Sequence, residues 1–318
     1  MNVTIDPLIN RGIDALKKNN PLEAEQIFKT LLQTHPMDPE INHFLGIALQ
    51  LLNKIKGAVI SYRTAVALNP SFAEAHKDLG NMLYRLGKIN EAEQSYKKAV
   101  DLKSNFTEAI TVLNIISEQK KVLSKLQFPK DYKENNKQFF ETRLSSNPFI
   151  ATRKVEAELM TCLYKMKSVE LDKTKDIRYG NGKCSPDLKL FENNQSIIKT
   201  LEKDLIDTMK QSVKSEIYVV ESFFNILSAR SGTTPHRHLD PFDKAYGITA
   251  QKCSLVYYLS AGDQNCSEPG ILRLYDPDEE ILPTEGSIII IPASRKHSSV
   301  YNGKIDRVMI GVNFYSLT

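Results

Sequence analysis

The sequence predicts an α + β protein with two main parts, an array of helix hairpins followed by a β-sheet domain with flanking helices. Three observations predict this class. Glycine, alanine and aromatic residues recur every 34 residues in the first third of the chain. After about residue 216, helical spacing of apolar residues gives way to short β-branched and aromatic runs. The stretch TTPHRHLD (233–240) then concentrates potential metal ligands after one such run.

The composition excludes several classes of protein. At 318 residues, 41% of them hydrophobic, the chain is long enough for two domains with sizeable cores. A net charge of +4 without basic clusters argues against a nucleic-acid partner. The four cysteines lack the spacing of a zinc site or a disulfide framework. No apolar run approaches about 18 residues and the N-terminus does not resemble a secretory signal, so we expect a cytoplasmic protein without a membrane partner.

The repeat is visible at several kinds of position. Its members are Gly12, Gly46, Gly80, Ala24, Ala58, Ala92, Phe28, Tyr62 and Tyr96, with Pro36 and Pro70 closing the first two units. Small residues let the helices of a hairpin approach, and we expect the aromatic to fill the space between neighbouring units. The pattern G-x11-A-x3-[FY]-x7-P resembles the tetratricopeptide repeat (TPR). The resemblance implies an α-solenoid of three repeats and a capping helix over residues 1–121, with a groove for a protein or peptide partner.

Residues 122–190 are expected to form a helical connector. The segments 128–146 and 152–167 have helical spacing, and 179–187 (YGNGKCSPD) is typical of a loop. Residues 194–213 then predict one amphipathic helix, with apolar side chains at 197, 198, 201, 205 and 209.

The last third of the chain predicts an all-β domain. Five runs rich in β-branched and aromatic residues are bounded by Gly, Pro, Asp or Asn, namely 217–229, 252–261, 270–276, 286–293 and 307–316. Strands at this spacing are typical of a sandwich or a barrel.

Potential metal ligands stand at strand ends in this region. In an extended chain His236, His238 and Asp240 share one face, because side chains alternate. His297 is the remaining histidine outside the helical repeats. Two imidazoles and a carboxylate suit non-haem Fe(II) with open coordination positions. The favoured set is His238, Asp240 and His297, and the pair His236 with His238 stays open as an alternative.

An anion-binding residue is expected on the final strand. Arg307 follows His297 by ten residues and begins the run RVMIGVNFYS. A guanidinium there can hold a carboxylate through two parallel hydrogen bonds. Arg273 and Arg295 are the alternatives.

The order of these motifs resembles a known family. HLDPF, CSLVYYLS, PGILRLYDP, EGSIIIIPASRKHSSVY and DRVMIGVNFY follow one another as in the 2-oxoglutarate- and Fe(II)-dependent dioxygenases, in the prolyl 4-hydroxylase-like branch. The resemblance covers about residues 190–318. It implies a double-stranded β-helix (jelly-roll, cupin-like) domain over residues 191–318.

The resemblance also implies a catalytic centre. Its residues would be His238, Asp240 and His297 for Fe(II), and Arg307 and Tyr258 (or else Tyr257) for 2-oxoglutarate. With O2, such an enzyme hydroxylates a C–H bond, here of a protein or peptide recruited by the repeats, and releases succinate and CO2. A cupin-like metal hydrolase or isomerase, or a non-catalytic TPR scaffold with a structural barrel, are the alternative functions.

Overall fold

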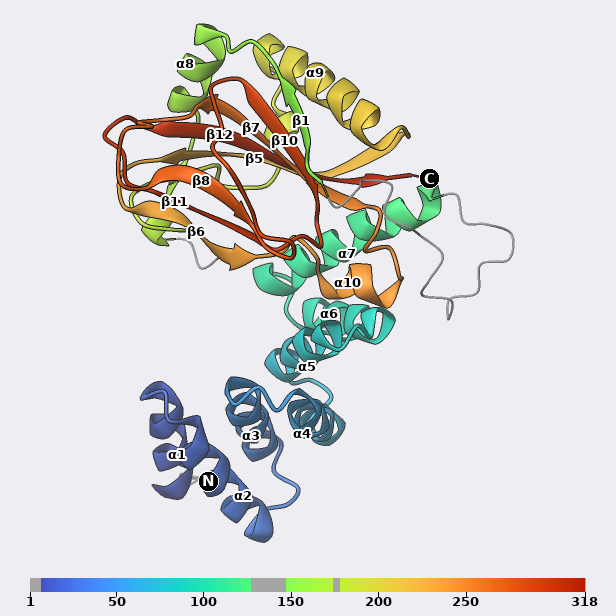
Figure 1. The fold of residues 1–318 in the computed structure, drawn as a ribbon. Helices are drawn as coiled ribbons and strands as arrows, with labels where there is room; N and C mark the ends of the chain where they lie inside the picture. The colour runs from blue at the N-terminus through green and yellow to red at the C-terminus, as the bar shows by residue number, and fades with distance from the viewer. Residues whose placement is uncertain (1–6, 127–146, 174–177, 318) are drawn as a thin grey trace. The chain divides into compact units, whose positions relative to one another are not determined.

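Figure 1 shows the computed structural model, which describes residues 7–126, 147–173 and 178–317. The chain divides into two compact units, Met1–Lys120 and Lys121–Thr318. The first is built of helices and the second contains two antiparallel β-sheets. The predicted order, a helical array followed by a sheet-rich domain, is confirmed. No helix within the described ranges combines the length and apolar character needed to cross a membrane.

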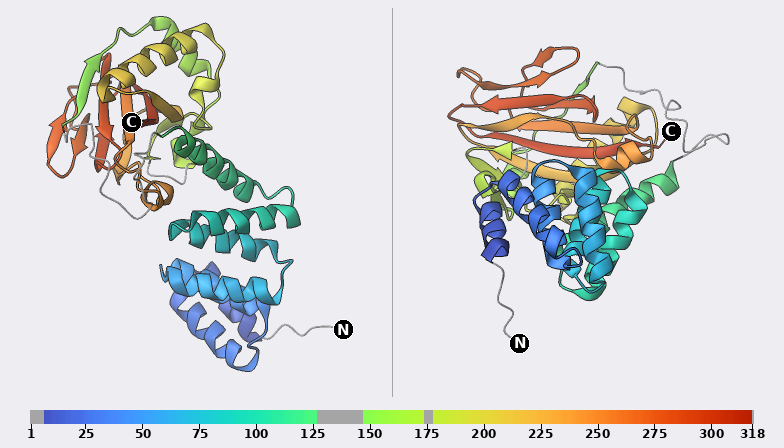
Figure 2. Two further views of the ribbon diagram at one scale, coloured as in Figure 1. Left: turned by 90° about the vertical axis from the view of Figure 1, so that its right-hand side faces the viewer. Right: turned by 90° about the horizontal axis from the view of Figure 1, so that it is seen from below.

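Helix hairpins make up the first unit (Figure 2). Its helices are α1 (Pro7–Lys17), α2 (Pro21–Thr34), α3 (Pro39–Leu51), α4 (Ile55–Leu68), α5 (Ala73–Arg85) and α6 (Ile89–Leu102), followed by α7 (Thr107–Lys125). Two helices begin with ordinary start signals. Pro21 and Pro39 occupy the first turns of α2 and α3, and the side chains of Asn20 and Asp38 accept hydrogen bonds from backbone N–H groups there.

The repeated glycines make room for the repeated aromatics. A Cβ atom added to Gly46 would lie 2.4 Å from Cε1 of Tyr62, and one added to Gly12 would lie 2.6 Å from Cζ of Phe28. Both aromatic side chains are fully buried. Each ring therefore packs on the glycine of its own hairpin. Phe28 also stacks on Phe44 of the next hairpin, with ring centres 5.5 Å apart, as expected for an aromatic between neighbouring units.

Replacing Gly46 by alanine is expected to destabilise the helical unit by about 1–3 kcal/mol, because the added methyl group overlaps the ring of Tyr62. Gly57→Ala is the matched control, since its Cβ would meet Cδ1 of Leu49 at 3.3 Å and alanine has the higher helix propensity. Urea unfolding followed by far-ultraviolet circular dichroism measures both variants. Equal stabilities of the two variants would contradict the packing described.

A buried hydrogen bond joins two hairpins. His43 on α3 and Asp78 on α5 are both buried, and His43 Nε2 lies 2.8 Å from Asp78 Oδ2. Lys77 Nζ lies 2.7 Å from Oδ1 of the same carboxylate. Burial opposes the charge of Asp78, but His43 and Lys77 outweigh it and hold the pKa of Asp78 below its ordinary value.

Asp78→Asn is expected to cost about 1–3 kcal/mol of stability at neutral pH. Because the folded pKa is lowered, this stabilisation is present above the unfolded pKa and is lost as the pH falls through the folded pKa. The difference between wild type and variant should therefore shrink as the pH falls below the ordinary aspartate pKa of about 3.9. Urea unfolding at neutral and at acidic pH checks this, with Asp101→Asn on the exposed face of α6 as control. If the difference in stability between wild type and Asp78→Asn did not depend on pH, the loss would come from the changed shape of the side chain and not from its charge.

The second unit is built on two sheets. The larger has the strand order β1-β10-β7-β12-β5-β4-β2, and the smaller has the order β3-β6-β11-β8-β9. The strands are β1 Phe149–Thr152, β2 Val169–Glu170, β3 Arg178–Tyr179, β4 Gly182–Cys184, β5 Ile217–Leu227, β6 Ser231–His236, β7 Lys252–Ser260, β8 Pro269–Leu274, β9 Glu279–Ile281, β10 Ser287–Pro292, β11 His297–Tyr301 and β12 Arg307–Ser316. These strands pair antiparallel, and among the strands described neither sheet closes on itself.

Alternation along β12 shows how the two faces of the larger sheet are used. One face carries the buried residues Val308, Ile310, Val312 and Phe314. The helices α8 (Ala157–Lys165) and α9 (Ser196–Val213) cover this face (Figure 1) and share its core. The apolar residues of α9 fall at the spacing that predicted an amphipathic helix. On the other face of β12, Met309, Gly311 and Asn313 line a cavity that the smaller sheet also borders.

The structure corrects the helical connector expected over residues 122–190. β1 pairs with β10 and β4 pairs with β5, so this stretch adds strands to the larger sheet. The predicted loop 179–187 contains β4 and the end of β3. Helix α8 confirms the helical spacing within 152–167, whereas 128–146 lies outside the described residues. Such short strands are too brief to show a period of two, so only their distant pairing partners define them.

Candidate metal centre

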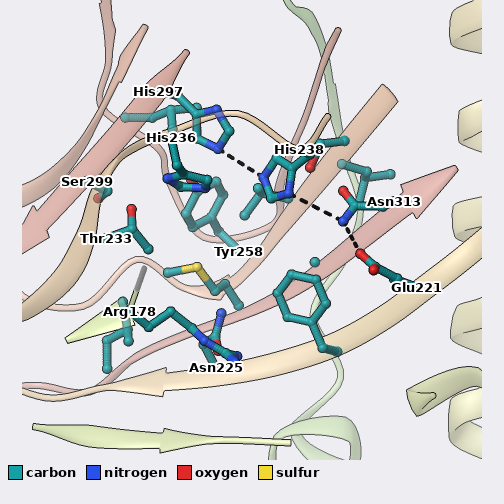
Figure 3. Close-up of a pocket in the computed structure, with 18 of the residues that line it drawn as sticks. Arg178, Glu221, Asn225, Thr233, His236, His238, Tyr258, His297, Ser299 and Asn313 are labelled. Carbon is teal, nitrogen blue, oxygen red and sulfur yellow. Dashed lines mark hydrogen bonds between the residues drawn. The ribbon is translucent and has the colours of Figure 1, made fainter. Parts of the chain in front are cut away.

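Three histidines converge at one end of the smaller sheet. His236 ends β6 and pairs directly with His297, which begins β11. His238 follows two residues after His236, and its backbone N–H donates to Ala293 O at 3.0 Å. Potential ligand nitrogens of the three imidazoles all lie within 4.8 Å of one another. Figure 3 shows the three rings gathered together.

Hydrogen bonds orient two of these rings. Nδ1 of His297 lies 3.1 Å from Arg295 O, and Nδ1 of His236 lies 2.7 Å from Thr234 O. A carbonyl oxygen only accepts, so Nδ1 carries the proton in both rings and leaves Nε2 with its lone pair. Nε2 of His238 lies 3.2 Å from Nε2 of His297. This is the arrangement by which backbone carbonyls direct histidines toward a shared metal ion.

Two histidines of the cluster, His238 and His297, are uncharged at neutral pH. Burial, with His236 adding to it, lowers the pKa of His297 to about 4. Burial, followed by the neighbouring histidines, also lowers the pKa of His238 well below its ordinary value. Neutral imidazole is the form that binds a metal, so no proton has to be removed first.

Asp240 is not part of this cluster. Its Oδ1 accepts from the backbone N–H groups of Phe242 and Asp243 at 2.8 and 3.1 Å, and its Oδ2 accepts from Lys252 Nζ at 3.0 Å. Asp240 is thus the N-cap of α10 (Pro241–Ala245). The alternation that placed it beside His238 requires a strand, but β6 ends at His236 and a helix begins at Pro241. The structure therefore groups His236, and not Asp240, with His238 and His297, while the ligand set itself stays a prediction.

A signal in the sequence could have anticipated this. Asp followed by Pro is a common helix start, and Asp243 at the third helical position completes a capping box with Asp240. From alternation we had instead expected Asp240 to continue the extended stretch that begins at His236.

A buried network that the sequence analysis missed anchors the same loop. Lys252 Nζ lies 2.9 Å from Asp243 Oδ2, and Tyr315 donates a short hydrogen bond to the other oxygen of Asp243. Burial opposes the charge of Lys252, but Asp243 and Asp240 prevail and raise its pKa. Nothing in the local pattern distinguishes Lys252 from an ordinary surface lysine.

The three histidines border a cavity of about 210 Å³ with mostly apolar walls. Strands of both sheets contribute to it, including Leu272 and Ser299 from the smaller sheet and Val256, Tyr258 and Met309 from the larger one. A cavity of this kind with few polar groups is typical of a small-molecule site.

Arg307 and Tyr258, which the family resemblance paired, lie together. The guanidinium of Arg307 stacks over the Tyr258 ring at 4.7 Å, and its Nη1 donates to the backbone oxygens of Pro269 and Gly270. Arg307 is fully buried, yet Nε and Nη2 have no hydrogen-bond partner in the described chain. An unpaired buried donor costs about 1–3 kcal/mol, and more on a charged group, so a carboxylate ligand there would remove a substantial penalty.

The alternative residues lie elsewhere. Tyr257 points into the core on the other face of the larger sheet, where its hydroxyl donates to Lys154 O at 3.2 Å. Arg273 pairs with Glu268 and Glu280 at 3.2 and 3.1 Å. Arg295 donates to Pro277 O at 2.6 Å and lies 3.4 Å from Glu279. None of these three residues lines the cavity.

Comparison with known proteins identifies the first unit only. Residues 73–106 match the family model described as tetratricopeptide repeat, and residues 51–87 match a second model described as TPR repeat. No curated protein matches the chain. Among solved structures, the chain is similar to the first TPR of Spaghetti (RPAP3) bound to an HSP90 peptide. The identity is 27%, over 36% of this chain and 90% of that one, with a TM-score of 0.35.

A second similar structure is the first TPR domain of the human RPAP3 protein. The identity is 28%, over 35% of this chain and 87% of that one, with a TM-score of 0.34. The family models match short stretches of the chain, so they identify repeats and not the chain as a whole. The N-terminal part of this protein is an array of tetratricopeptide repeats, a module associated with protein–protein interaction.

Proposed function

We propose that this protein is an Fe(II)- and 2-oxoglutarate-dependent oxygenase that hydroxylates a C–H bond of a protein or peptide recruited by its repeats. The observation that carries the proposal is the convergence of three imidazoles on a cavity, with a buried guanidinium behind the cavity wall that still has unpaired donors. The two sheets that border the cavity are consistent with a double-stranded β-helix, which we include in the proposal.

His236, His238 and His297 would hold the metal. Three protein ligands on one side leave further coordination positions open for the cosubstrate and O2. When bound, the iron would supply the oxidative decarboxylation of 2-oxoglutarate to succinate and CO2 and the oxidation of the C–H bond. The backbone carbonyls of Arg295 and Thr234 would keep two of the rings in the tautomer that binds metal.

Arg307 and Tyr258 would bind the distal carboxylate of 2-oxoglutarate. Tyr258 lines the cavity and stacks on Arg307, which itself does not line it. We therefore expect the Tyr258 ring to shift when a carboxylate binds Nε and Nη2 of Arg307. The apolar walls formed by Leu272 and Met309 would exclude water from the reaction.

A zinc hydrolase is the second candidate, because three histidines with an open position are also a catalytic zinc set. Such an enzyme binds no dicarboxylate cosubstrate and has no use for the unpaired donors of Arg307. A non-catalytic scaffold is the third candidate, and it has no use for oriented, neutral histidines. Arg307 therefore favours the oxygenase.

An anaerobic titration of the Fe(II)-loaded full chain with 2-oxoglutarate tests the proposal. We expect a weak visible charge-transfer band, lost in His297→Ala and weakened in Arg307→Lys, which keeps the charge but not the planar fork. Arg273→Lys, on the surface, should retain the band. Metal binding without a band would favour the hydrolase, and no metal binding would favour the scaffold.

A further inference from the structure

A second arginine lies at the cavity, away from the histidines. Arg178 begins β3 and pairs with Thr233 on β6, three residues before His236. Three residues of a strand span about 10 Å. Figure 3 shows Arg178 in the wall of the cavity, well separated from the histidine cluster.

Neighbouring side chains position the guanidinium of Arg178. Its Nη1 donates to Asn225 Oδ1 at 3.1 Å, and Asn225 is buried. The guanidinium also lies 5.9 Å from the centre of the Phe223 ring. That ring covers Gly311, where an added Cβ would lie 2.4 Å from it. An amide and an aromatic ring thus restrict an otherwise flexible side chain, which lowers the entropy lost on binding a ligand.

The charge pattern of the cavity favours an anion near Arg178. Among the described residues that line it, Arg178 is the one arginine or lysine and Glu221 is the one carboxylate. Glu221 accepts a hydrogen bond from Asn313, its direct partner on β12. It precedes Asn225 by four residues on β5, about 13 Å, so it lies at the other end of the cavity from Arg178. Within mostly apolar walls a guanidinium attracts a carboxylate or phosphate strongly.

We propose that Arg178 binds an anionic group of the molecule that is hydroxylated, so that the substrate is acidic near its reactive carbon. The inference rests on the proposed function, in which Arg307 takes the carboxylate of the cosubstrate. The two arginines stand on different elements, and only Arg178 lines the cavity directly. They therefore recognise two different anionic groups.

Peptide selectivity of the full-length holoenzyme tests this. Short N-acetylated, C-amidated peptides carry Asp, Glu or phosphoserine at a central position, and matched peptides carry Asn, Gln or Ser. Succinate release from 2-oxoglutarate is measured for each, and peptide binding is measured separately without O2. In the wild type, acidic peptides are expected to stimulate succinate release roughly 10- to 100-fold more than their neutral partners. If the Asp and Glu peptides stimulate succinate release, Arg178 binds a carboxylate. If the phosphoserine peptides do so, it binds a phosphate.

Three variants complete the test. Arg178→Gln is expected to abolish the preference for acidic peptides, Arg178→Glu to shift it to Lys- or Arg-containing peptides, and Arg273→Gln to leave it unchanged. The inference is overturned if Arg178→Gln keeps the preference, or if the wild type turns over 2-oxoglutarate but responds only to neutral peptides or to none. If the wild type shows no charge-transfer band with 2-oxoglutarate, the proposed function fails, and anaerobic peptide binding decides separately whether Arg178 selects anions.

Discussion

Replacing His236 by alanine is expected to weaken binding of Fe(II) or Zn(II) by at least about 100-fold, more than loss of an outer-shell hydrogen bond usually costs. The reason is geometric. His236 pairs directly with His297, and its Nδ1 is held by Thr234 O, so its Nε2 is the nitrogen that remains available to a metal ion. Competition with a chelator of known affinity measures the effect. His35→Ala, in the helical unit, is the matched control.

The same measurement on Asp240→Asn separates the two ligand sets. Asparagine can still cap α10 through its side-chain oxygen, so the helix that follows the His238 loop keeps its N-cap. The variant loses one ion pair with Lys252 and should lose some stability. Metal affinity is expected to stay within about tenfold of the wild type. Loss of metal in Asp240→Asn together with retention in His236→Ala would restore the ligand set of His238, Asp240 and His297.

Replacing Lys252 by methionine is expected to destabilise the sheet-rich unit by about 3–5 kcal/mol at neutral pH. The substitution removes the ammonium group shared by Asp243, which is fully buried, and Asp240. Breaking a buried pair on one side costs more than the pair itself contributes, because a charge is left without its partner. The pKa of Lys252 is raised, so its contribution is present throughout the range below the unfolded lysine pKa.

The destabilisation caused by Lys252→Met should depend on pH in a defined direction. Burial raises the pKa of Asp243, and Lys252 opposes that rise. Without Lys252 the pKa of Asp243 rises further, so the folded state loses stability as the pH increases from the unfolded aspartate pKa to the new folded value. Destabilisation should therefore be smaller at about pH 4 than at about pH 8.

Urea unfolding followed by near-ultraviolet circular dichroism of tyrosine checks this, since the chain contains no tryptophan. Lys183→Met, at an exposed lysine of the same unit, is the control. Adding Asp243→Asn to Lys252→Met should recover part of the loss, because the two side chains are coupled. Equal effects of Lys183→Met and Lys252→Met would show that the buried network contributes no net stability.

Much of the fold could be predicted from the sequence because its signals are local and periodic. Three copies of one spacing define the hairpins, and the fit of Gly46 to Tyr62 explains why those residue types recur. Helix α9 and the long strands β5, β7, β10 and β12 carry enough residues for a period to be recognised. The short strands β1 to β4 do not, and they exist only through pairing with distant strands.

The candidate site, like the fold, was predicted only where its signals are local. The sequence by itself determined which part of the chain contains the histidines and placed Arg307 on the last strand. The family resemblance paired Arg307 with Tyr258 or Tyr257, and the structure shows Tyr258 beside it. Only the tertiary structure shows that His236, and not Asp240, lies with the other two histidines. That choice depends on where β6 ends and α10 begins, and on a lysine buried twelve residues away in the chain. Side-chain alternation holds only within a strand, whereas a cap, a buried ion pair and a cavity wall arise from contacts that no local period encodes.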